Sequence, residues 1–513
     1  MNHISILIFC VFTFSLFSQD VLVEDANNPE AEFHAAINPT DTNNIVLATQ
    51  NDFGGTPTIT IYYTLDFGNT WSISNYHGTP SGYNISGDAV LSYNSLGEVF
   101  LVNLAASDTE VNTILSKSSD GGATWSLVST VESGFTDKPW FAIDRHATSP
   151  HQGNMYVPLV TNVISLYTLD DNYQVTNSIA LADGEHLPSV VVKKDGTVFT
   201  SSIEMASPNV LYVQEYSNGG TTLVHSTQVV SFPDYLFSAP DVSLRFQPTA
   251  YLAMDNSGGS YDGRLYLSYT GSEAINPDYF NIFLMYSDDN GLTWSTPSVV
   301  HSDIQSEVQQ FYSSMYVNDN GVLILDWYDR KNYTNTNKLT DFFMGVSHDG
   351  GSNFAETQLN TLSSDFNYVI PSSGDFGIGE YHQLVATNHT AVSFWSDGRT
   401  NDEDLNIYMA KVNINGPLAV EESSLVTNKI GISSLYPNPA YDVVFSDIDL
   451  TEAAKIKYDV INASGQVITK TDWVQYSAGQ HTLEFRVDVP TGVYFINLVT
   501  DSGYFKTMKI VKP

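Results

Sequence analysis

The segment Thr64-Leu65-Asp66-Phe67-Gly68-Asn69-Thr70-Trp71 decides the fold of this chain, because it recurs along the sequence. Three further segments share its form S/T-x-D-x-G-x-x-W/F: Ser118–Trp125, Ser287–Trp294 and Ser347–Phe354. The spacing between the first two copies is close to the spacing between the last two. A regular repeat of this kind indicates an array of similar small units.

The second and third copies are farther apart, by close to three of these spacings. We therefore expect two degenerate copies between them, and the candidates are Asp170–Asn172 and Ser217–Gly220. Pairs of apolar, strand-like runs recur in the same phase, such as His34–Ile37 followed by Ile45–Ala48. Counting these pairs gives seven units, which start near Glu32, Asp88, Lys138, His186, Tyr251, Ser314 and His382.

Units of four short strands that cannot bury both faces alone predict an all-β fold of the β-propeller type. Seven blades are favoured over six by the number of units. The chain is rich in residues that strands prefer, with 30 Tyr, 27 Phe and 7 Trp. The last unit lacks a fourth strand before residue 415, and the N-terminal run Val21–Glu24 can supply it and close the ring.

The repeated segments resemble the Asp boxes of sialidases and other propeller proteins, and the resemblance covers residues 20 to about 415. In such a turn the carboxylate accepts backbone N–H groups, glycine supplies a positive φ, and the aromatic ring packs between strands. The resemblance implies turns that join the two outer strands of a blade, away from the binding face. We therefore expect a structural role for Asp66, Asp120, Asp289 and Asp349.

The N-terminal run Ile4–Phe17 is apolar and is followed by the small residue Ser18, which indicates a secretory signal peptide over residues 1–18. Cys10 is the only cysteine and leaves with this peptide, so the mature chain is expected to have no disulfide and no thiolate metal site. No other apolar run is long enough to cross a bilayer, which predicts a soluble mature protein without a transmembrane segment.

The formal net charge is −37, from 20 basic and 57 acidic residues. Such a field repels phosphate backbones, and nucleic acid is therefore excluded as an expected partner. Two explanations of the acidity stay open. One is solubility in a salty extracellular medium, and the other is calcium bound by Asp and Asn oxygens. No other cofactor is predicted.

The C-terminal region separates from the repeats at a polar linker, which we place at residues 416–431. Short strands then alternate with turn residues over 432–513, which favours a small β-sandwich. Four of its segments, in this order, resemble the type A sorting domain of the type IX secretion system of Bacteroidetes: Leu435–Ala440, Val460–Gln466, Pro490–Phe495 and Lys506–Pro513. The resemblance implies export through the outer membrane, with the module removed or used for surface attachment. An appended sandwich that binds carbohydrate is the alternative.

In a propeller, ligands bind on the face where the first strand of each blade starts and the second strand ends. The predicted starts of the first strands carry charged or aromatic residues: Glu32-Phe33-His34, Asp88, Asp137-Lys138, Glu185-His186 and Glu380-Tyr381-His382. Strand alternation places each Glu and His of a triplet on one side. His34, His382 and Tyr381 are therefore candidate catalytic residues, the histidines as general bases or metal ligands. A hydrogen-bonded pair that rigidifies the rim is the alternative.

The predicted ends of the second strands carry Glu204, Asp326–Arg330 and Trp395–Arg399. Glu204 is a further catalytic candidate. The planar fork of arginine suits a carboxylate or a sulfate. The candidate substrate-binding residues are Arg245, Arg330, Arg399, Lys138, Asp329 and Asp397. The alternative is an Asp–Arg pair that holds each loop within its own blade.

Sialidases are similar to this chain in scaffold but differ in the expected site. The family has an Arg-Ile-Pro motif before its first box, whereas this chain has no arginine before Arg145. Glu204, Arg245, Arg330 and Tyr381 follow the order of the remaining family residues, but the flanking sequences do not match. True sialidase activity is therefore not expected.

Other seven-bladed propellers are polysaccharide lyases, which neutralise a uronate carboxylate with arginine and abstract a proton with histidine or tyrosine. The residue types at this rim could supply both roles. Two hypotheses result. The first is a secreted or surface-bound propeller that binds or cleaves extracellular, anionic glycans as a hydrolase or a lyase. The second is a non-catalytic recognition or adhesion propeller with a protein ligand.

Overall fold

The computed structural model consists of β-strands, and the part of the chain that it describes contains no helix. It divides into two compact units, Leu16–Glu421 and a second unit that contains Glu422–Pro513. The described residues are 20–24, 29–51, 57–76, 83–181, 186–205, 208–232, 250–273, 276–302, 308–333, 339–366, 378–400, 405–415, 419–420, 430–432, 435–440, 442–450, 453–462, 467–487, 489–500 and 505–512.

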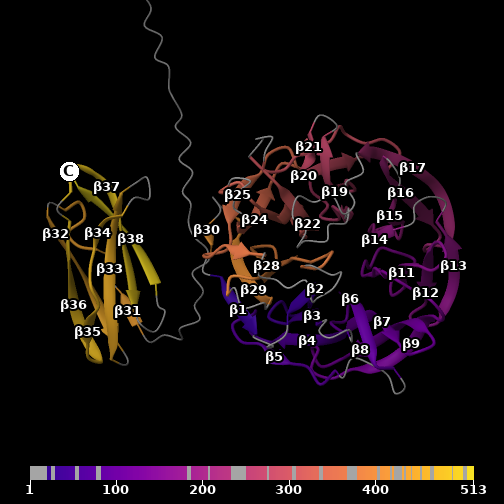
Figure 1. Ribbon diagram of the computed structural model, residues 1–513, viewed down its shortest axis with the longest axis horizontal. Helices are drawn as coiled ribbons and strands as arrows, with labels where there is room; N and C mark the ends of the chain where they lie inside the picture. Colours follow the sequence, from indigo (N-terminus) through magenta and orange to yellow (C-terminus); the bar gives the residue numbers. More distant parts are fainter. Residues whose placement is uncertain are drawn as a thin grey trace, which may run out of the picture. The chain divides into compact units, whose positions relative to one another are not determined.

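The larger unit consists of antiparallel sheets of consecutive strands, arranged as a ring (Figure 1). The first sheet is β2 (Glu30–Ile37), β3 (Ile45–Asn51), β4 (Thr58–Thr64) and β5 (Ser72–Ile73). The second is β6 (Ile85–Tyr93), β7 (Val99–Ala106), β8 (Val111–Ser118) and β9 (Ser126–Glu132). The third is β10 (Ala142–Ile143), β11 (Met155–Val160), β12 (Ile164–Leu169) and β13 (Val175–Ala180).

The next sheets continue the same order around the ring (Figure 1). The fourth is β14 (His186–Val192), β15 (Val198–Glu204), β16 (Asn209–Ser217) and β17 (Thr222–Phe232). The fifth is β18 (Ala250–Met254), β19 (Leu265–Glu273), β20 (Asn276–Ser287) and β21 (Ser298–Val299). The sixth is β22 (Gln310–Val317), β23 (Leu323–Asp329), β24 (Leu339–Ser347) and β25 (Ala355–Gln358), with β26 (Ser364–Asp365) also on β24.

The seventh sheet joins the two ends of the ring. It contains β27 (Val385–Ala386), β28 (Thr390–Asp397) and β29 (Asn406–Asn413), and β1 (Val21–Glu24) pairs with β29 at its outer side. A short strand, β30 (Ala419–Val420), also pairs with β29. The expectation that Val21–Glu24 supplies the missing strand is confirmed by this pairing. The predicted unit starts fall at or next to the first strands of these sheets.

The Asp-box turns connect the third and fourth strands of their sheets. In the first box, Asp66 Oδ1 accepts the N–H groups of Asn69 and Thr70 at 3.0 and 2.8 Å. Gly68 has φ +74°, and a Cβ there would lie 2.9 Å from Met409 of the neighbouring sheet. The turn thus needs glycine both for its backbone and for its contact with the next sheet. Asp170, in a predicted degenerate copy, accepts N–H groups of its own turn in the same way.

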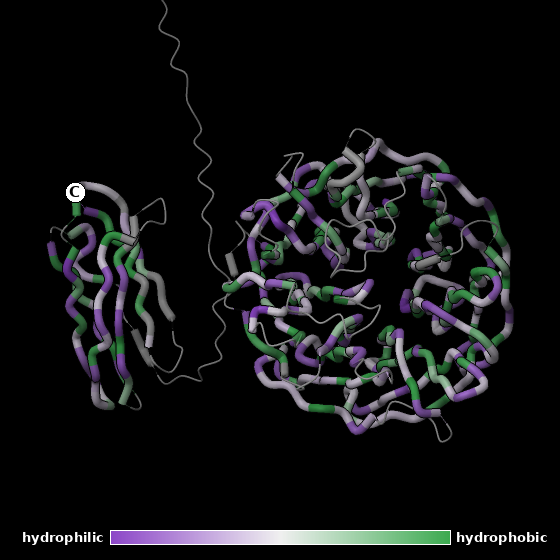
Figure 2. Tube along the Cα trace, in the orientation of Figure 1, coloured by the Kyte–Doolittle hydropathy of each residue, from purple (hydrophilic) through white to green (hydrophobic). Residues whose placement is uncertain are grey.

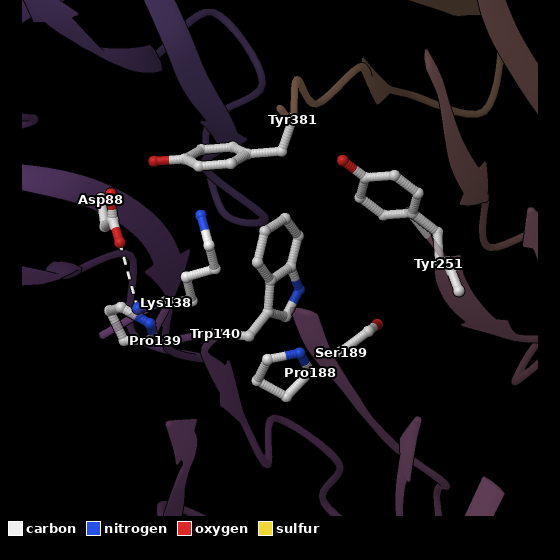
Figure 3. Close-up of a pocket in the computed structure, with 9 residues that line it drawn as sticks. Asp88, Lys138, Pro139, Trp140, Pro188, Ser189, Tyr251 and Tyr381 are labelled. Carbon is white, nitrogen blue, oxygen red and sulfur yellow. Dashed lines mark hydrogen bonds between the residues drawn. The ribbon is translucent and has the colours of Figure 1, made fainter. Parts of the chain in front are cut away.

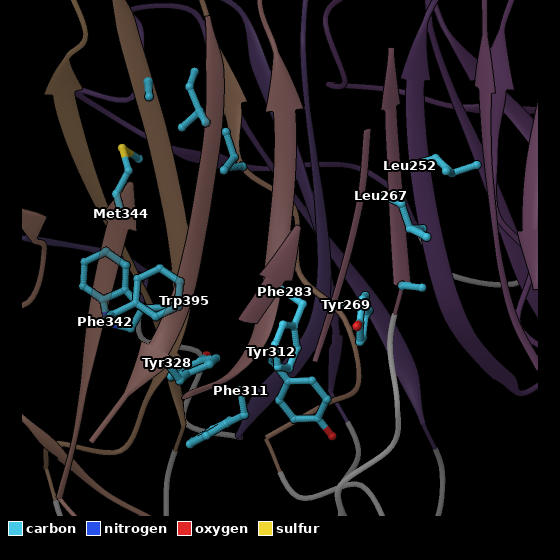
Figure 4. Packing of buried hydrophobic residues seen from close by; sticks show 14 of the residues in the cluster. Leu252, Leu267, Tyr269, Phe283, Phe311, Tyr312, Tyr328, Phe342, Met344 and Trp395 are labelled. Atoms are coloured by element: carbon cyan, nitrogen blue, oxygen red, sulfur yellow. The ribbon is translucent and has the colours of Figure 1, made fainter. Parts of the chain in front are cut away.

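The sheets are held together by aromatic and aliphatic side chains packed between them. Figure 4 shows part of the largest cluster, where Phe342 stacks on Trp395 with ring centroids 5.0 Å apart. Within the fifth sheet, Tyr269 stacks on its cross-strand partner Phe283 at 5.2 Å and belongs to the same cluster. Hydrophobic segments occur in the sheets all around the ring (Figure 2). The core is therefore distributed between neighbouring sheets, as the repeated sequence units require.

The C-terminal unit contains two sheets. One consists of β31 (Ile430–Ile432), β32 (Val443–Leu450) and β36 (Gly479–Arg486). The other consists of β34 (Val467–Lys470), β33 (Ala454–Asn462), β37 (Gly492–Thr500) and β38 (Phe505–Lys512), with β35 (Val474–Tyr476) on β33. Both sheets contribute to one hydrophobic core, which includes Val444, Phe485, Val460, Ile496 and Ile510.

Candidate functional site

The first strands of several sheets begin with a distorted backbone. Glu32 in β2 and Asp88 in β6 have positive φ angles of 47° and 51°, and Lys138, in the segment that leads to β10, has a φ of 45°. β-Bulges accompany Glu32 in β2 and Asp88 in β6. Non-glycine residues rarely adopt this conformation, and it persists only where the surrounding structure enforces it. The bulge also interrupts strand alternation, so the rule that placed Glu32 and His34 on one side does not apply across it.

These distorted positions bring three carboxylates and one amine together. Glu32, Asp88 and Glu380 are 1%, 8% and 1% exposed. The Lys138 ammonium group forms an ion pair with Glu380, and the Lys138 backbone N–H donates to Asp88 Oδ2 at 3.1 Å. Gly379 allows the close approach of this segment, because a Cβ there would lie 2.5 Å from the Glu32 nitrogen. Neither Glu32 oxygen accepts a hydrogen bond of normal geometry.

Burial and mutual repulsion shift the protonation of this cluster. Burial raises the pKa of Asp88 to about 6. The attraction of Lys138 lowers this pKa, and repulsion from Asp137 and Glu380 raises it. The pKa of Glu32 is raised well above its usual value, by burial first and then by Asp88 and Glu380. A carboxyl group that keeps its proton near pH 6 can act as a general acid.

A small pocket lies directly in front of this cluster. Figure 3 shows Asp88, Lys138, Trp140, Tyr251 and Tyr381 around it. The Trp140 ring lies edge-on to the rings of Tyr251 and Tyr381, with centroids 5.5 and 5.6 Å apart. The pocket is partly open, and the centre of a water-sized group can occupy about 20 Å³ of it. Trp140 also lines a second cavity of about 260 Å³.

Tyr381, a predicted catalytic residue, belongs to this pocket. Its hydroxyl group is buried and has no hydrogen-bond partner in the described part of the chain. Burial raises the pKa of Tyr381 well above its usual value, and the Asp88 and Glu32 carboxylates raise it further. The phenol therefore remains protonated at neutral pH, so it can donate a hydrogen bond but is a poor general base.

The two predicted catalytic histidines lie in different surroundings. His34 Nδ1 accepts the Leu91 N–H at 3.3 Å, and burial lowers the pKa of His34 to about 3. His34 is thus neutral, and it packs against Trp140 at 5.4 Å and lines the second cavity. His382 Nε2 lies 2.9 Å from Asp326 Oδ1, and both side chains are buried. Neither histidine lines the pocket in front of Asp88.

The charged loops after the second strands are held by contacts within the fold. Asp397 accepts the Trp395 indole N–H at 2.8 Å and pairs with Arg399 at 2.6 Å. Asp329 accepts the Trp327 indole N–H at 3.0 Å in the same way. The Arg399 guanidinium also pairs with Asp20, which connects this loop to the start of β1.

Arg330 and Glu204, predicted residues that the structure describes, are not part of the pocket. Arg330 is 8% exposed and donates to the side chains of Thr340 and Gln309, both at 3.1 Å. Glu204 accepts the Tyr212 hydroxyl at 3.0 Å. Arg245 lies outside the described residues, and so does Glu185.

Sequence reasoning missed several residues of the site. It named Glu32, Asp88 and Glu380 as charged strand starts but proposed no role for them, and it overlooked Trp140 and Tyr251. The available signal was an acidic residue at the same position of successive repeats. Among the described residues, no group of three or more His, Cys, Asp or Glu side chains is arranged to hold a metal ion.

Two segments of the chain match known families. Residues 434–513 match the secretion system C-terminal sorting domain, and residues 285–296 match the BNR/Asp-box repeat. The sorting domain indicates export through the type IX secretion system to the cell surface or the extracellular space. Comparison with curated proteins gives no match. The described residues include no helix that is long and apolar enough to cross a membrane.

Solved structures with similar topology are distant in sequence. A protein of unknown function from Dyadobacter fermentans is 12% identical, with a TM-score of 0.42, covering 77% of this chain and 98% of that one. An α-L-arabinanase from Penicillium chrysogenum is 12% identical, with a TM-score of 0.44 and coverage of 79% and 100%. A sialidase from Streptococcus pneumoniae is 11% identical, with a TM-score of 0.41 and coverage of 62% and 68%. At these scores the activity of this chain must be argued from its own residues.

Proposed function

We propose that this protein binds and hydrolyses an extracellular glycan, with Asp88 as the acid–base residue. The observation that supports this role is a carboxyl group with a pKa of about 6 that lines an aromatic pocket. Protonation of a glycosidic oxygen needs such a group, together with a second carboxylate that stays ionised. Glu380 is suited to the second role, because it lies in the same cluster and forms an ion pair with the Lys138 ammonium group. Aromatic rings beside carboxylates suit the apolar and polar faces of a sugar.

The charge of the site favours a glycan without acidic groups at the cleaved residue. Lys138 forms an ion pair with Glu380, and Asp88 becomes negatively charged above about pH 6, so the site offers no free positive charge to a uronate or a sulfate. The arginines that the anionic hypothesis needs, Arg330 and Arg399, donate to groups of the fold itself. We therefore favour an uncharged or cationic substrate over the anionic one expected from the sequence.

The proposed architecture places this site on a seven-bladed propeller over residues 19–415. Each sheet of the ring is then one blade, and the signal peptide at 1–18 precedes it. Residues 416–431 form the linker, and residues 432–513 form a β-sandwich sorting domain. Secretion by the sorting domain would bring the site to polymeric glycans outside the cell.

The test is hydrolysis of a glycan panel by the purified full chain. We expect new reducing ends from neutral or amino-containing polysaccharides and none from uronate-rich or sialylated ones. Activity should fall as the pH rises above about 6, where Asp88 loses its proton. Product from acidic glycans alone, or an Asp88→Asn variant with full activity, would overturn the proposal.

A recognition protein without catalysis is the second candidate. The burial of the three carboxyl groups favours it, because Glu32, Asp88 and Glu380 are 1%, 8% and 1% exposed and a glycosidic oxygen must come within hydrogen-bond distance of a catalytic carboxyl group. In that case the same panel would give retention on immobilised glycans without new reducing ends. Binding that survives Asp88→Asn would then assign recognition to another surface.

A further inference from the structure

The second cavity lies at the centre of the ring. Figure 1 shows β14 and β22 nearer this centre than β17 and β25, the outer strands of the same sheets. The first strands of all seven sheets line the second cavity, and Ile37, Val191 and Leu252 are among their apolar residues. The centres of water-sized groups can occupy about 260 Å³ of it. A water molecule needs about 10–15 Å³ of such space, so the second cavity has room for a small organic molecule.

One end of the second cavity is polar. Arg145 and His146 follow β10 in the chain, and Asn256 follows β18. Strands β6 and β10 begin at or next to the Asp88 cluster, so the residues after β10 lie toward the opposite end of the second cavity. Side-chain contacts join these segments. His146 Nε2 is 3.3 Å from Asn256 Nδ2, and the Arg145 guanidinium donates a hydrogen bond to the Tyr316 hydroxyl of β22.

Arg145 is an exposed cation that lines the second cavity and forms no ion pair with any residue that the structure describes. Arg264 and Arg399, by contrast, each pair with an aspartate. The chain has 57 acidic and 20 basic residues, so a basic side chain has many carboxylates available as partners. A guanidinium that lines a cavity without such a partner can take a carboxylate from a ligand.

The other charges at this end favour a ligand with a single negative charge. Burial lowers the pKa of His146, so its ring is neutral at pH 7 and adds no second cation. Asp319 also lines this end and forms no ion pair with Arg145, so its charge repels a doubly charged anion more than a singly charged one. Asp144, close to His146, accepts the Ser149 hydroxyl at 2.5 Å and is thus held within the fold.

The amide groups at this end are also held by the fold. Asn256 Nδ2 donates to the Val192 carbonyl at 3.0 Å, and Asn318 Oδ1 accepts the Val322 N–H at 3.0 Å. These contacts fix the loops that surround Arg145. The guanidinium is therefore the group at this end that remains available to bind a ligand, and its planar fork matches the two oxygens of a carboxylate.

We propose that the second cavity is a binding site for a small organic monocarboxylate. Its carboxylate pairs with Arg145, and its apolar body lies between the first strands. The site goes beyond the proposed hydrolysis and does not use Asp88, although Trp140 lines both the second cavity and the pocket in front of Asp88. An uncharged molecule of the same shape would keep the contacts of the body and lose the ion pair.

Calorimetric titration of the full chain with benzoate and benzamide at pH 7 tests the proposal, because these molecules match in shape and differ in charge. We expect benzoate to bind about ten-fold more tightly than benzamide, the size of one favourable hydrogen-bonded ion pair. Acetate should bind more weakly than benzoate, because it lacks a body that contacts the apolar walls. Equal affinities for benzoate and benzamide, or tighter binding of sulfate than of benzoate, would overturn the proposal.

Variants locate the binding site. Arg145→Gln should lower the affinity for benzoate to that for benzamide. Lys117→Gln, which removes a positive charge that is paired with Glu98, is the matched control and should retain the preference. Ser92→Leu enlarges a side chain that lines the second cavity and leaves Arg145 in place, so it should weaken the binding of both molecules. Thermal unfolding verifies that each variant is folded. An unchanged preference in folded Arg145→Gln, or an unchanged benzoate affinity in folded Ser92→Leu, would contradict the proposal.

Discussion

At the ends of the second strands the buried carboxylates find partners within the fold, whereas at the starts of the first strands Glu32 does not. Asp397 binds the Trp395 indole and Arg399, and Asp329 binds the Trp327 indole. Glu32 has no partner of normal geometry for either oxygen. Both regions carry buried acidic residues, so residue type and burial alone do not distinguish them.

The difference lies in the local backbone. In the second-strand loops, a regular strand ends in Trp-x-Asp, and the carboxylate bonds the indole two residues earlier and a backbone N–H two residues later. In the first strands, bulges with positive φ at Glu32 and Asp88 bring carboxyl groups from separate sheets together. A complete set of partners stabilises a loop, while an incomplete one leaves charge available to a ligand. The comparison can be tested by removing charges from each region.

Asp88→Asn should give the largest effect, on activity. Loss of the acid–base carboxyl is expected to lower kcat/KM about 1000-fold on the glycan that the wild type hydrolyses. Thermal unfolding should not shift to lower temperature, because a buried charge is removed. Asp171→Asn is the control, with activity equal to the wild type. A stable Asp88→Asn variant with undiminished kcat/KM would mean that the first-strand carboxyl groups, like those of the second-strand loops, have no role in catalysis.

Arg399→Ala should cause the next largest effect, on stability. It leaves Asp397 and Asp20 buried without their cation, and their side chains are 1% and 3% exposed. We expect a loss of about 3 kcal/mol in the free energy of unfolding, measured by denaturant titration. Lys194→Ala breaks the more exposed pair with Asp262 and should cost below about 1 kcal/mol. Equal losses in the two variants would show that the Arg399 loop is not specially stabilised.

The sequence predicted the parts of this fold that repeat, and it predicted less of the site. Box turns depend on local hydrogen bonds and glycine geometry, so Asp66 and Gly68 predict a turn from their own segment. The contact between Lys138 and Glu380 joins residues 242 positions apart. The bulge at Glu32 interrupts the alternation from which its side was predicted. Such distant contacts and irregular strands leave no periodic pattern in the sequence.

The raised pKa of Asp88 predicts a pH-dependent stability of defined sign. Its pKa is about 6 in the folded chain and near 3.8 when unfolded, so the folded state binds the proton more tightly. The contribution of Asp88 to the free energy of unfolding is greatest below about pH 4 and is lost as the pH rises through about 6. The loss should amount to about 2 kcal/mol, measured by denaturant titration from pH 4 to 7. Asp88→Asn should reduce this loss of stability between pH 4 and 7. An unchanged loss in the variant would mean that other groups cause it.

Tyr381→Phe should give the smallest effect, a modest gain in stability. The Tyr381 hydroxyl is buried without a partner, so its removal relieves an uncompensated desolvation cost. We expect a gain of about 1 kcal/mol by denaturant titration. Tyr62→Phe is the matched control, because the Tyr62 hydroxyl donates to Glu30 at 2.7 Å and its loss should destabilise the fold by a similar amount. Destabilisation by both substitutions would mean that the Tyr381 hydroxyl forms a hydrogen bond within the fold. The buried polar groups at the first strands would then be better partnered than we infer.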